Sequence, residues 1–368
     1  MKIERIEIRH TKMELVTPFT TSMGTEYDEE HIMVRIDGEG LTGWGESVAE
    51  GTPFYSYETV TTAWHIMKDF LIPEILGKDI NDVGEAIALY DRVRGHMMAK
   101  AGIESALWDL LAKGSGVSLS KMLGGTRDKI DVGVSIGIPD SEKELLHKIE
   151  GYLTEGYKRV KIKIAPGHDL NLVKAVRREY PDIMFQVDAN SAYTLDDISL
   201  FKKMDDYNLS LIEQPLGYED IYDHSKLQRE LKTSICLDES IHSLDDTRAA
   251  IELKSCKIIN IKPGRVGGFT ESKKIHDYCM SMGIPVWHGG MLESGIGRAG
   301  NVALASLPGF VLPGDISASK KYYKEDIVEP AFTVNSDGRM NVPQGKGIGV
   351  EINEKRLEKV TVKKEIFS

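Results

Sequence analysis

The chain has 368 residues with a formal net charge of −11, and 41% of its residues are hydrophobic. This length and composition favour two domains with a sizeable core, while the acidic balance argues against nucleic acid and anionic membranes as partners. No apolar run of about 18 residues is present, so no transmembrane helix is expected. The opening residues lack the apolar stretch of a signal peptide, and three cysteines suit a reducing compartment, which together predict a cytoplasmic protein.

The first predicted unit, residues 1–125, combines strands with helices. Residues 2–15, 29–37 and 41–48 alternate apolar and polar side chains or follow glycine-rich punctuation, which is typical of antiparallel strands. Residues 57–116 then change to helical spacing, most clearly in 101–113, where glycines after Lys113 end the helix. We therefore expect an α+β domain here.

From residue 131 onward, short strand-like runs alternate with stretches long enough for one helix each. Eight such runs are present: 131–137, 159–164, 184–190, 210–216, 234–240, 257–264, 285–291 and 310–315. Alternating strands and helices predict parallel strands, and eight units closing on themselves predict a (β/α)₈ barrel, of the TIM type, over residues 126–320. An open doubly wound sheet is the alternative, but no GxGxxG loop follows the first strand.

After residue 320 the chain returns to strands and turns. We expect residues 321–368 to pack back onto the first unit, so that the N-terminal segment and the C-terminal tail together cap the barrel.

Charged residues recur near the carboxyl ends of five consecutive predicted strands. The intervals are 25 residues, the last being 24, in the series Lys163, Asp188, Glu213, Asp238 and Lys262. Their apolar neighbours have the opposite parity along each strand and would face the helices. The charged side chains would then point inward at the C-terminal mouth of the barrel, where barrels of this type carry active sites.

Three buried carboxylates on neighbouring strands need a shared countercharge, because each uncompensated charge costs several kcal/mol in a dry interior. A divalent cation supplies it, and ligands that are all oxygen favour Mg²⁺. A single aspartate of this kind would be read as a helix cap, and a pair of lysines as a solvated edge. The ordered set of five favours a reactive site.

Two lysines beside a metal-bound carboxylate suit removal of the proton α to that carboxylate, with an enediolate intermediate. Lys161 shares a strand face with Lys163 in "RVKIKI", so we expect it to lower the pKa of Lys163 and to contact the substrate carboxylate.

The motifs "KIK" (161–163), "DAN" (188–190), "EQP" (213–215), "DES" (238–240) and "KPGRVGG" (262–268) resemble the muconate-lactonizing-enzyme subgroup of the enolase superfamily. Residues 17–25 and 101–113 resemble its capping domain. The resemblance implies Asp188, Glu213 and Asp238 as ligands of Mg²⁺, with Mn²⁺ or Co²⁺ as substitutes. It also implies Lys163 and Lys262 as the acid/base pair, a small-molecule carboxylate substrate and a homo-oligomer.

Lysine rather than histidine on the sixth strand disfavours the mandelate-racemase subgroup, and we interpret His288 as a pocket-lining or core residue. Residues 289–310 and 313–319 resemble the o-succinylbenzoate synthase and N-acylamino acid racemase family. That resemblance implies dehydration of 2-succinyl-6-hydroxy-2,4-cyclohexadiene-1-carboxylate in menaquinone biosynthesis, or racemisation of N-succinylamino acids. Gly300 departs from the family, whose members often have histidine there.

Muconate cycloisomerase and dipeptide epimerase are the alternatives within the subgroup. Dipeptide epimerases typically show Asp-x-Asp at the eighth strand, where this chain has Asp315-Ile316-Ser317. A non-enzymatic binding barrel is disfavoured because all five charged residues are present. The side chains expected to contact substrate are Lys161, Asn190, Ser135, Phe19, Met23, Met291 and Ser294, with simple core packing as the alternative for Phe19 and Met23.

Overall fold

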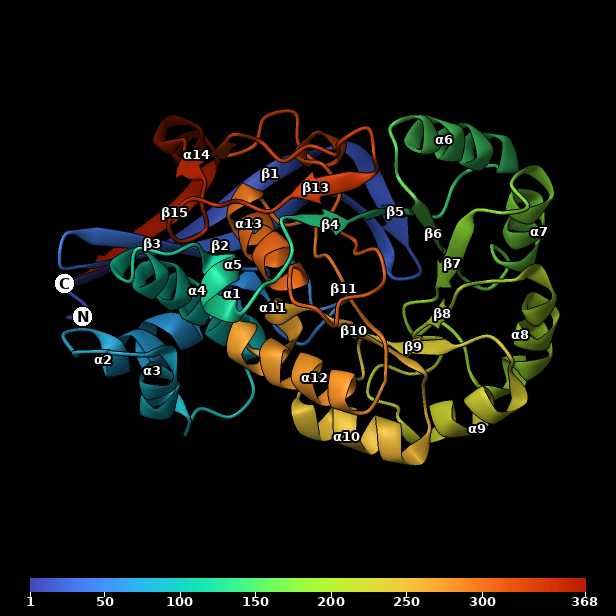
Figure 1. Cartoon of the computed structure of the whole chain (residues 1–368), viewed down its shortest axis with the longest axis horizontal. Coiled ribbons are helices and arrows are strands. Elements are labelled where there is room, and N and C mark those ends of the chain that lie inside the picture. The colour runs from blue at the N-terminus through green and yellow to red at the C-terminus, as the bar shows by residue number, and fades with distance from the viewer.

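The computed structural model describes residues 1–368, and its N-terminal part forms a four-stranded antiparallel sheet covered by helices (Figure 1). The strands pair in the order β15 (Thr361–Phe367), β1 (Arg5–Thr21), β2 (Gly24–Gly38) and β3 (Leu41–Ser47). The helices are α1 (Val60–Ile66), α2 (Ile72–Ile75), α3 (Val83–Tyr90), α4 (Met97–Gly114) and α5 (Leu119–Leu123), with a π-helical turn at Met67–Leu71. The strands and the long helix predicted for this unit are confirmed.

Glycine allows α4 to lie directly against β3. A Cβ atom on Gly45 would lie 2.5 Å from the backbone nitrogen of Ala106, which is closer than real Cβ contacts. The "GWG" segment within the predicted strand 41–48 is therefore also a packing surface for the helix.

Seven parallel strands form a curled sheet, and one or more helices follow each strand around its outside (Figure 1). The strands, in spatial order, are β5 (Gly133–Ile136), β6 (Arg159–Lys163), β7 (Met184–Asp188), β8 (Ile212–Glu213), β9 (Ile235–Leu237), β10 (Ile258–Ile261) and β11 (Val286–His288). The helices are α6 (Glu142–Thr154), α7 (Leu170–Glu179), α8 (Ile198–Met204), α9 (Tyr222–Glu230), α10 (Leu244–Leu253), α11 (Pro263–Val266), α12 (Phe269–Ser281) and α13 (Gly295–Ala305). The alternation predicted from the sequence is confirmed.

The eighth predicted strand, 310–315, is not a regular strand. It closes the ring through single bridges instead, from Phe310 to Val286 on β11 and from Gly314 to Val132 beside β5. The backbone nitrogen of Gly133 donates to the carbonyl of Gly314 at 2.7 Å. Pro313 lacks an N–H group, so a continuous ladder cannot form here.

The C-terminal tail contacts both parts of the molecule. Strand β15 pairs with β1, while β13 (Arg339–Asn341) pairs with β4 (Lys129–Asp131) at the start of the barrel. The remaining elements are β12 (Val328–Glu329), β14 (Glu351–Ile352) and α14 (Glu354–Val360). The exact domain boundaries at residues 125 and 320 stay a prediction.

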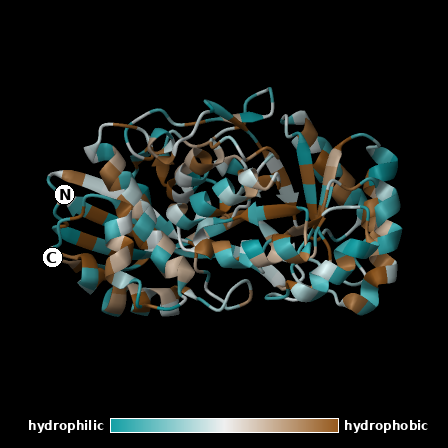
Figure 2. Ribbon diagram, turned by 60° about the horizontal axis from the view of Figure 1, so that its bottom comes forward, coloured by the Kyte–Doolittle hydropathy of each residue, from teal (hydrophilic) through white to brown (hydrophobic).

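Two large hydrophobic clusters and one small one form the core. The largest, of 60 buried residues, joins the barrel strands to their helices and includes a few residues of the cap strands, and a second of 28 lies between the cap sheet and its helices. A third cluster has four residues from the barrel strands and their edges: Leu211, Cys236, Ile258 and Trp287. Hydrophobic and hydrophilic segments alternate along the peripheral helices, as expected when one face of each helix packs inward (Figure 2). No helix of the structure is both long and apolar enough to span a bilayer.

Gly300 is explained by the packing of α13. A Cβ atom at Gly300 would lie 2.4 Å from Cζ of Phe269, so the Phe269 ring occupies the space that a side chain would need. We expect Gly300→Ala to lower the free energy of unfolding by about 1–3 kcal/mol, because the ring must shift to admit the methyl group. Thermal unfolding followed by circular dichroism measures this.

Gly151→Ala is the matched control, since Gly151 lies within α6 and a Cβ atom there would meet nothing within 4 Å. That change is expected to be neutral or to stabilise by up to about 1 kcal/mol, because alanine is the better helix former. Equal effects of the two substitutions would contradict the packing described for Gly300.

Candidate active site

The five charged residues predicted from the 25-residue interval lie side by side across β6 to β10. Lys163 is in register with Asp188, and Asp188 with Glu213, while Asp238 and Lys262 directly follow β9 and β10. All five side chains are buried, with no more than 7% of any residue exposed. The structure therefore brings the whole set together at the carboxyl ends of the strands.

The two predicted catalytic lysines stand at opposite ends of this row. Lys163 Nζ lies 2.7 Å from both Asp188 Oδ2 and Asn190 Oδ1. Lys262 Nζ lies 2.8 Å from Asp238 Oδ2. Burial by itself lowers the pKa of Lys262, but Asp238 outweighs it and holds the pKa well above its usual range. Lys262 is therefore a cation in this structure.

Lys161 precedes Lys163 by two residues on β6 and pairs with three carboxylates. Its Nζ is 2.9 Å from Asp188 Oδ2, 2.8 Å from Glu213 Oε2 and 2.6 Å from Asp315 Oδ2. Burial lowers the pKa of Lys161, but the three carboxylates together hold it well above its usual range. Lys161 is thus a fixed cation bound by the protein itself, and its expected contact with a substrate carboxylate stays a prediction.

The carboxylates have the chemistry of a hard-metal site, although no three of them converge as ligands in this structure, where each faces a lysine or arginine. Asp238 Oδ2 is buried and accepts no hydrogen bond, despite its short distance to Lys262. Burial first, and then Asp188 and Asp238, raise the pKa of Glu213 well above its usual range. Lys161 and Lys163 beside Asp188, and Lys262 and Arg265 beside Asp238, hold the pKa of these two carboxyls below its usual range despite their burial. The buried, all-oxygen set fits a divalent cation such as Mg²⁺.

Sequence reasoning missed several polar partners of this row. Tyr55, from the cap, donates through its hydroxyl to Asp238 Oδ1 at 3.0 Å and accepts from Lys262 Nζ at 3.0 Å. Arg265 also pairs with Asp238, and Asn260 Nδ2 donates to Glu213 Oε1 at 2.7 Å. Arg265 falls within the "KPGRVGG" motif, so its position was available as a signal. No sequence signal indicated Tyr55, because its loop is distant from the barrel strands in the chain and contacts them only after folding.

The hairpin of β1 and β2 lies over the barrel mouth. Ser22 Oγ donates to the carbonyls of Ala189 and Asn190, at 3.1 and 3.2 Å, beyond the end of β7. On the other side, the nitrogen of Ile138 donates to the carbonyl of Thr20 at 2.8 Å. Phe19, on the same hairpin, places its ring centroid 6.0 Å from Lys163 Nζ. The cap therefore covers the site that the strands assemble.

The other five residues expected to contact substrate have different surroundings from one another. Asn190 accepts from Lys163 and donates to Glu239 at 2.9 Å, and Ser135 on β5 has a buried hydroxyl without a partner. Met291 belongs to the hydrophobic cluster of the cap, and Met23 is partly buried against that cluster. Ser294 is the N-cap of α13 and donates to Glu46 Oε2 at 2.6 Å. Substrate contacts of these five residues stay predictions.

His288 is fully buried, and neither ring nitrogen has a hydrogen-bond partner. Its ring packs beside Phe310, with 5.9 Å between centroids. Burial lowers the pKa of His288 to about 3, so the imidazole is neutral at ordinary pH. These contacts are those of a core histidine.

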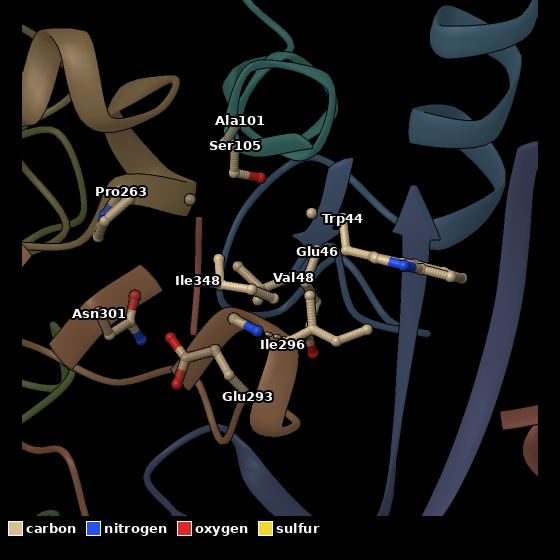
Figure 3. A pocket seen from close by; sticks show the side chains of 13 residues that line it. Trp44, Glu46, Val48, Ala101, Ser105, Pro263, Glu293, Ile296, Asn301 and Ile348 are labelled. Atoms are coloured by element: carbon tan, nitrogen blue, oxygen red, sulfur yellow. Dashed lines mark hydrogen bonds between the residues drawn. The ribbon is translucent and has the colours of Figure 1, made fainter. Parts of the chain in front are cut away.

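A cavity of 30 Å³ lies where β3 and α4 of the cap meet α11 and α13 (Figure 3). Glu46, on its wall, accepts hydrogen bonds from the nitrogens of Ser294 and Gly297 at 3.0 and 2.8 Å, which fastens the cap to the start of α13. The volume corresponds to about one water molecule, and none of the five charged residues lines it. This cavity is therefore part of the domain interface and not a substrate site.

Glu50 belongs to the cap segment that carries Tyr55. Burial first, and then Glu26, raise the pKa of Glu50 to about 8, against the attraction of Lys262 and Lys163. Between its ordinary pKa and 8 the folded protein keeps a proton that the unfolded chain releases, so stability falls as pH rises through this window. We expect Glu50→Gln to stabilise the protein by about 2 kcal/mol at pH 9 and to have little effect at pH 4.5.

Thermal unfolding at the two pH values measures this difference. Glu252→Gln, at an exposed position on α10, is the control and should shift neither transition. A Glu50→Gln variant whose effect is the same at both pH values would contradict the raised pKa.

This chain is similar to known proteins over its full length. Residues 3–124 match the family described as mandelate racemase / muconate lactonizing enzyme, N-terminal domain, and residues 144–356 match enolase C-terminal domain-like. An o-succinylbenzoate synthase of Bacillus subtilis is 51% identical over 100% of this chain and 99% of its own. An N-succinylamino acid racemase of Thermus thermophilus is 46% identical over 98% of both chains. A solved enolase-superfamily structure from Listeria innocua has a TM-score of 0.96 at 44% identity, covering 100% of this chain and 99% of that one.

Proposed function

Because the chain belongs to the mandelate racemase and muconate lactonizing enzyme family of the enolase superfamily, we propose that it removes the proton α to a carboxylate with the help of Mg²⁺. Its reaction is the dehydration of 2-succinyl-6-hydroxy-2,4-cyclohexadiene-1-carboxylate to o-succinylbenzoate. The observation that carries this proposal is the row of Lys163, Asp188, Glu213, Asp238 and Lys262 on consecutive strands. Full-length similarity to relatives named o-succinylbenzoate synthase supports the choice of reaction.

Asp188, Glu213 and Asp238 are the residues that would hold Mg²⁺. When bound, the ion supplies positive charge at the substrate carboxylate, which stabilises the negative charge that develops when the α-proton leaves. The burial of all three carboxylates keeps bulk water away from them.

In the dehydration, Lys163 acts twice. Its neutral amine takes the α-proton, and the resulting ammonium gives a proton to the hydroxyl group as that group leaves from the same face. Lys262, at the other end of the row, stays protonated and stabilises the developing negative charge. Its pairing with Asp238, which holds its pKa well above the usual range, supports this role as a cation.

A second candidate function is the racemisation of N-succinylamino acids. The placement of a lysine at each end of the carboxylate row favours it, because one lysine can remove the α-proton while the other returns a proton on the opposite face. Similarity to a relative named N-succinylamino acid racemase also supports it. Both substrates carry a carboxylate next to the acidic carbon and a succinyl arm, so one site can accept both.

Dipeptide epimerase is the less favoured alternative, since it requires an anionic group for the free α-ammonium of a dipeptide. Asp315 is already bound, with Oδ1 2.5 Å from Arg159 and Oδ2 2.6 Å from Lys161. Residue 317, where a second aspartate would be expected, is serine.

The two functions are separated by assaying both in D₂O with Mg²⁺. Deuterium exchange at the α-carbon of N-succinylphenylglycine, followed by NMR, reports the racemase step. Absorbance of o-succinylbenzoate reports the dehydration. Dehydration without exchange on any N-acylamino acid identifies a dedicated synthase, and absence of both reactions contradicts the proposed function.

A further inference from the structure

Lys321 is partly buried, and its ammonium group makes no hydrogen bond or ion pair with the protein. It lies at the end of a 3₁₀ turn, Ser319–Lys321, that follows the segment closing the barrel. Its ammonium nitrogen lies 4.2 Å from the ring centroid of Tyr322 and 5.4 Å from that of Phe19. Aromatic faces attract a cation but do not neutralise it, so the charge of Lys321 remains available to an anion.

Lys321 and the proposed catalytic Lys163 both lie near the ring of Phe19 in the cap hairpin. The Phe19 centroid is 6.0 Å from Lys163 Nζ and 5.4 Å from Lys321 Nζ. Phe19 belongs to the hairpin that covers the barrel mouth, where Ser22 is hydrogen-bonded to the loop after β7. Lys321 therefore stands beside the reaction site, one aromatic ring away from Lys163.

The surroundings of Lys321 are short of negative charge. Asp315, the acidic group that raises its pKa, is already bound by Arg159 and Lys161. Burial first, and then the positive charges of Arg298, Lys161 and Lys163, lower the pKa of Lys321 to about 7 against the attraction of Asp315. An incoming carboxylate would relieve this accumulation of positive charge and hold Lys321 protonated.

We propose that Lys321 binds a second carboxylate of the substrate, at the far end of its acyl arm, and so selects succinyl compounds over neutral acyl compounds. This inference rests on the proposed function, which places the first carboxylate and the α-carbon at Lys163. The flexible arm of a succinyl group would pass Phe19 to reach Lys321. Charge-assisted hydrogen bonds of lysine to carboxylate give the preference its physical basis.

The test compares two ligand pairs that differ only at the end of the arm. Binding of o-succinylbenzoate and of 2-butyrylbenzoate, in which a methyl group replaces the terminal carboxylate, is measured by titration calorimetry with Mg²⁺ present. Exchange of N-succinylphenylglycine and of N-butyrylphenylglycine is measured by NMR. We expect Lys321→Met to reduce the preference for the succinyl member of each pair by about tenfold or more, and Lys321→Arg to keep most of it.

Lys320→Met is the matched control, because the adjacent Lys320 is exposed and pairs with Glu155 at 2.9 Å on the surface. It should leave both preferences as in the unmodified protein. Equal weakening of succinyl and butyryl ligands by Lys321→Met, or an unchanged preference, overturns the inference. If neither reaction occurs but the preference between the two benzoates depends on Lys321, the proposed function fails while the anion site stands.

Discussion

Replacement of Lys163 by alanine is expected to lower kcat for both the dehydration and the α-proton exchange by about 10³-fold or more, since a positioned general base contributes on the order of 10² to 10⁴. The variant loses the only ammonium group that contacts both Asp188 and Asn190. Stopped assays of o-succinylbenzoate formation and NMR of N-succinylphenylglycine measure the two losses. Lys262→Ala should abolish the exchange to a similar degree.

Lys202→Ala is the control for the loss of one lysine. Lys202 pairs with Glu230 on the surface, and about half of its side chain is exposed, so its removal should leave both rates unchanged. A Lys163→Ala variant that keeps its fold by circular dichroism and retains a tenth or more of either rate would contradict the assignment of Lys163 as the base.

Removal of the divalent cation is expected to abolish activity, and addition of Mg²⁺ to raise the thermal stability of the metal-free protein. At 100 times its dissociation constant, a ligand that binds only the folded state stabilises it by about 2.7 kcal/mol. In Glu213→Gln this Mg²⁺-dependent rise in melting temperature should largely disappear, because the neutral amide is a poorer ligand for a hard cation. Differential scanning fluorimetry with and without EDTA gives this readout independently of activity.

Glu230→Gln serves as the matched acidic control, since Glu230 is an exposed partner of Lys202 at the end of α9. Its response to Mg²⁺ should equal that of the unmodified protein. If Glu213→Gln responds to Mg²⁺ as strongly as the control, Glu213 is not a ligand.

The alternating strands and helices of the barrel, and the five charged residues of its site, could be predicted from local sequence patterns. Side chains alternate across a strand, and each strand–helix unit here takes about the same number of residues. Equal spacing of charged residues therefore places them at the same level of successive parallel strands. For this reason Lys163, Asp188, Glu213, Asp238 and Lys262 could be identified together, and the register of β6, β7 and β8 agrees with the interval. The same rules predicted the long helix α4 and the strands of the cap.

The parts that local patterns left open all depend on contacts between distant residues. Segment 310–315 has the composition of a strand. It forms only single bridges to Val286 and Val132, because Pro313 interrupts the hydrogen-bond ladder. Tyr55 is 183 residues from Asp238 in the chain and 3.0 Å from it in space. Lys161 follows the predicted alternation, but only the fold shows that three carboxylates of the protein already bind it.

Sequence periodicity thus determined which residues line the mouth of the barrel, because periodicity fixes the direction of each side chain relative to its own strand. Only the tertiary structure shows which groups from other segments contact the charged residues of this row, cover the barrel mouth, or lie next to the site. The cap loop supplies Tyr55, the hairpin supplies Phe19, and the turn after the barrel supplies Lys321. These groups come from chain segments whose approach depends on how the two large hydrophobic clusters pack together, and no short-range pattern encodes that packing.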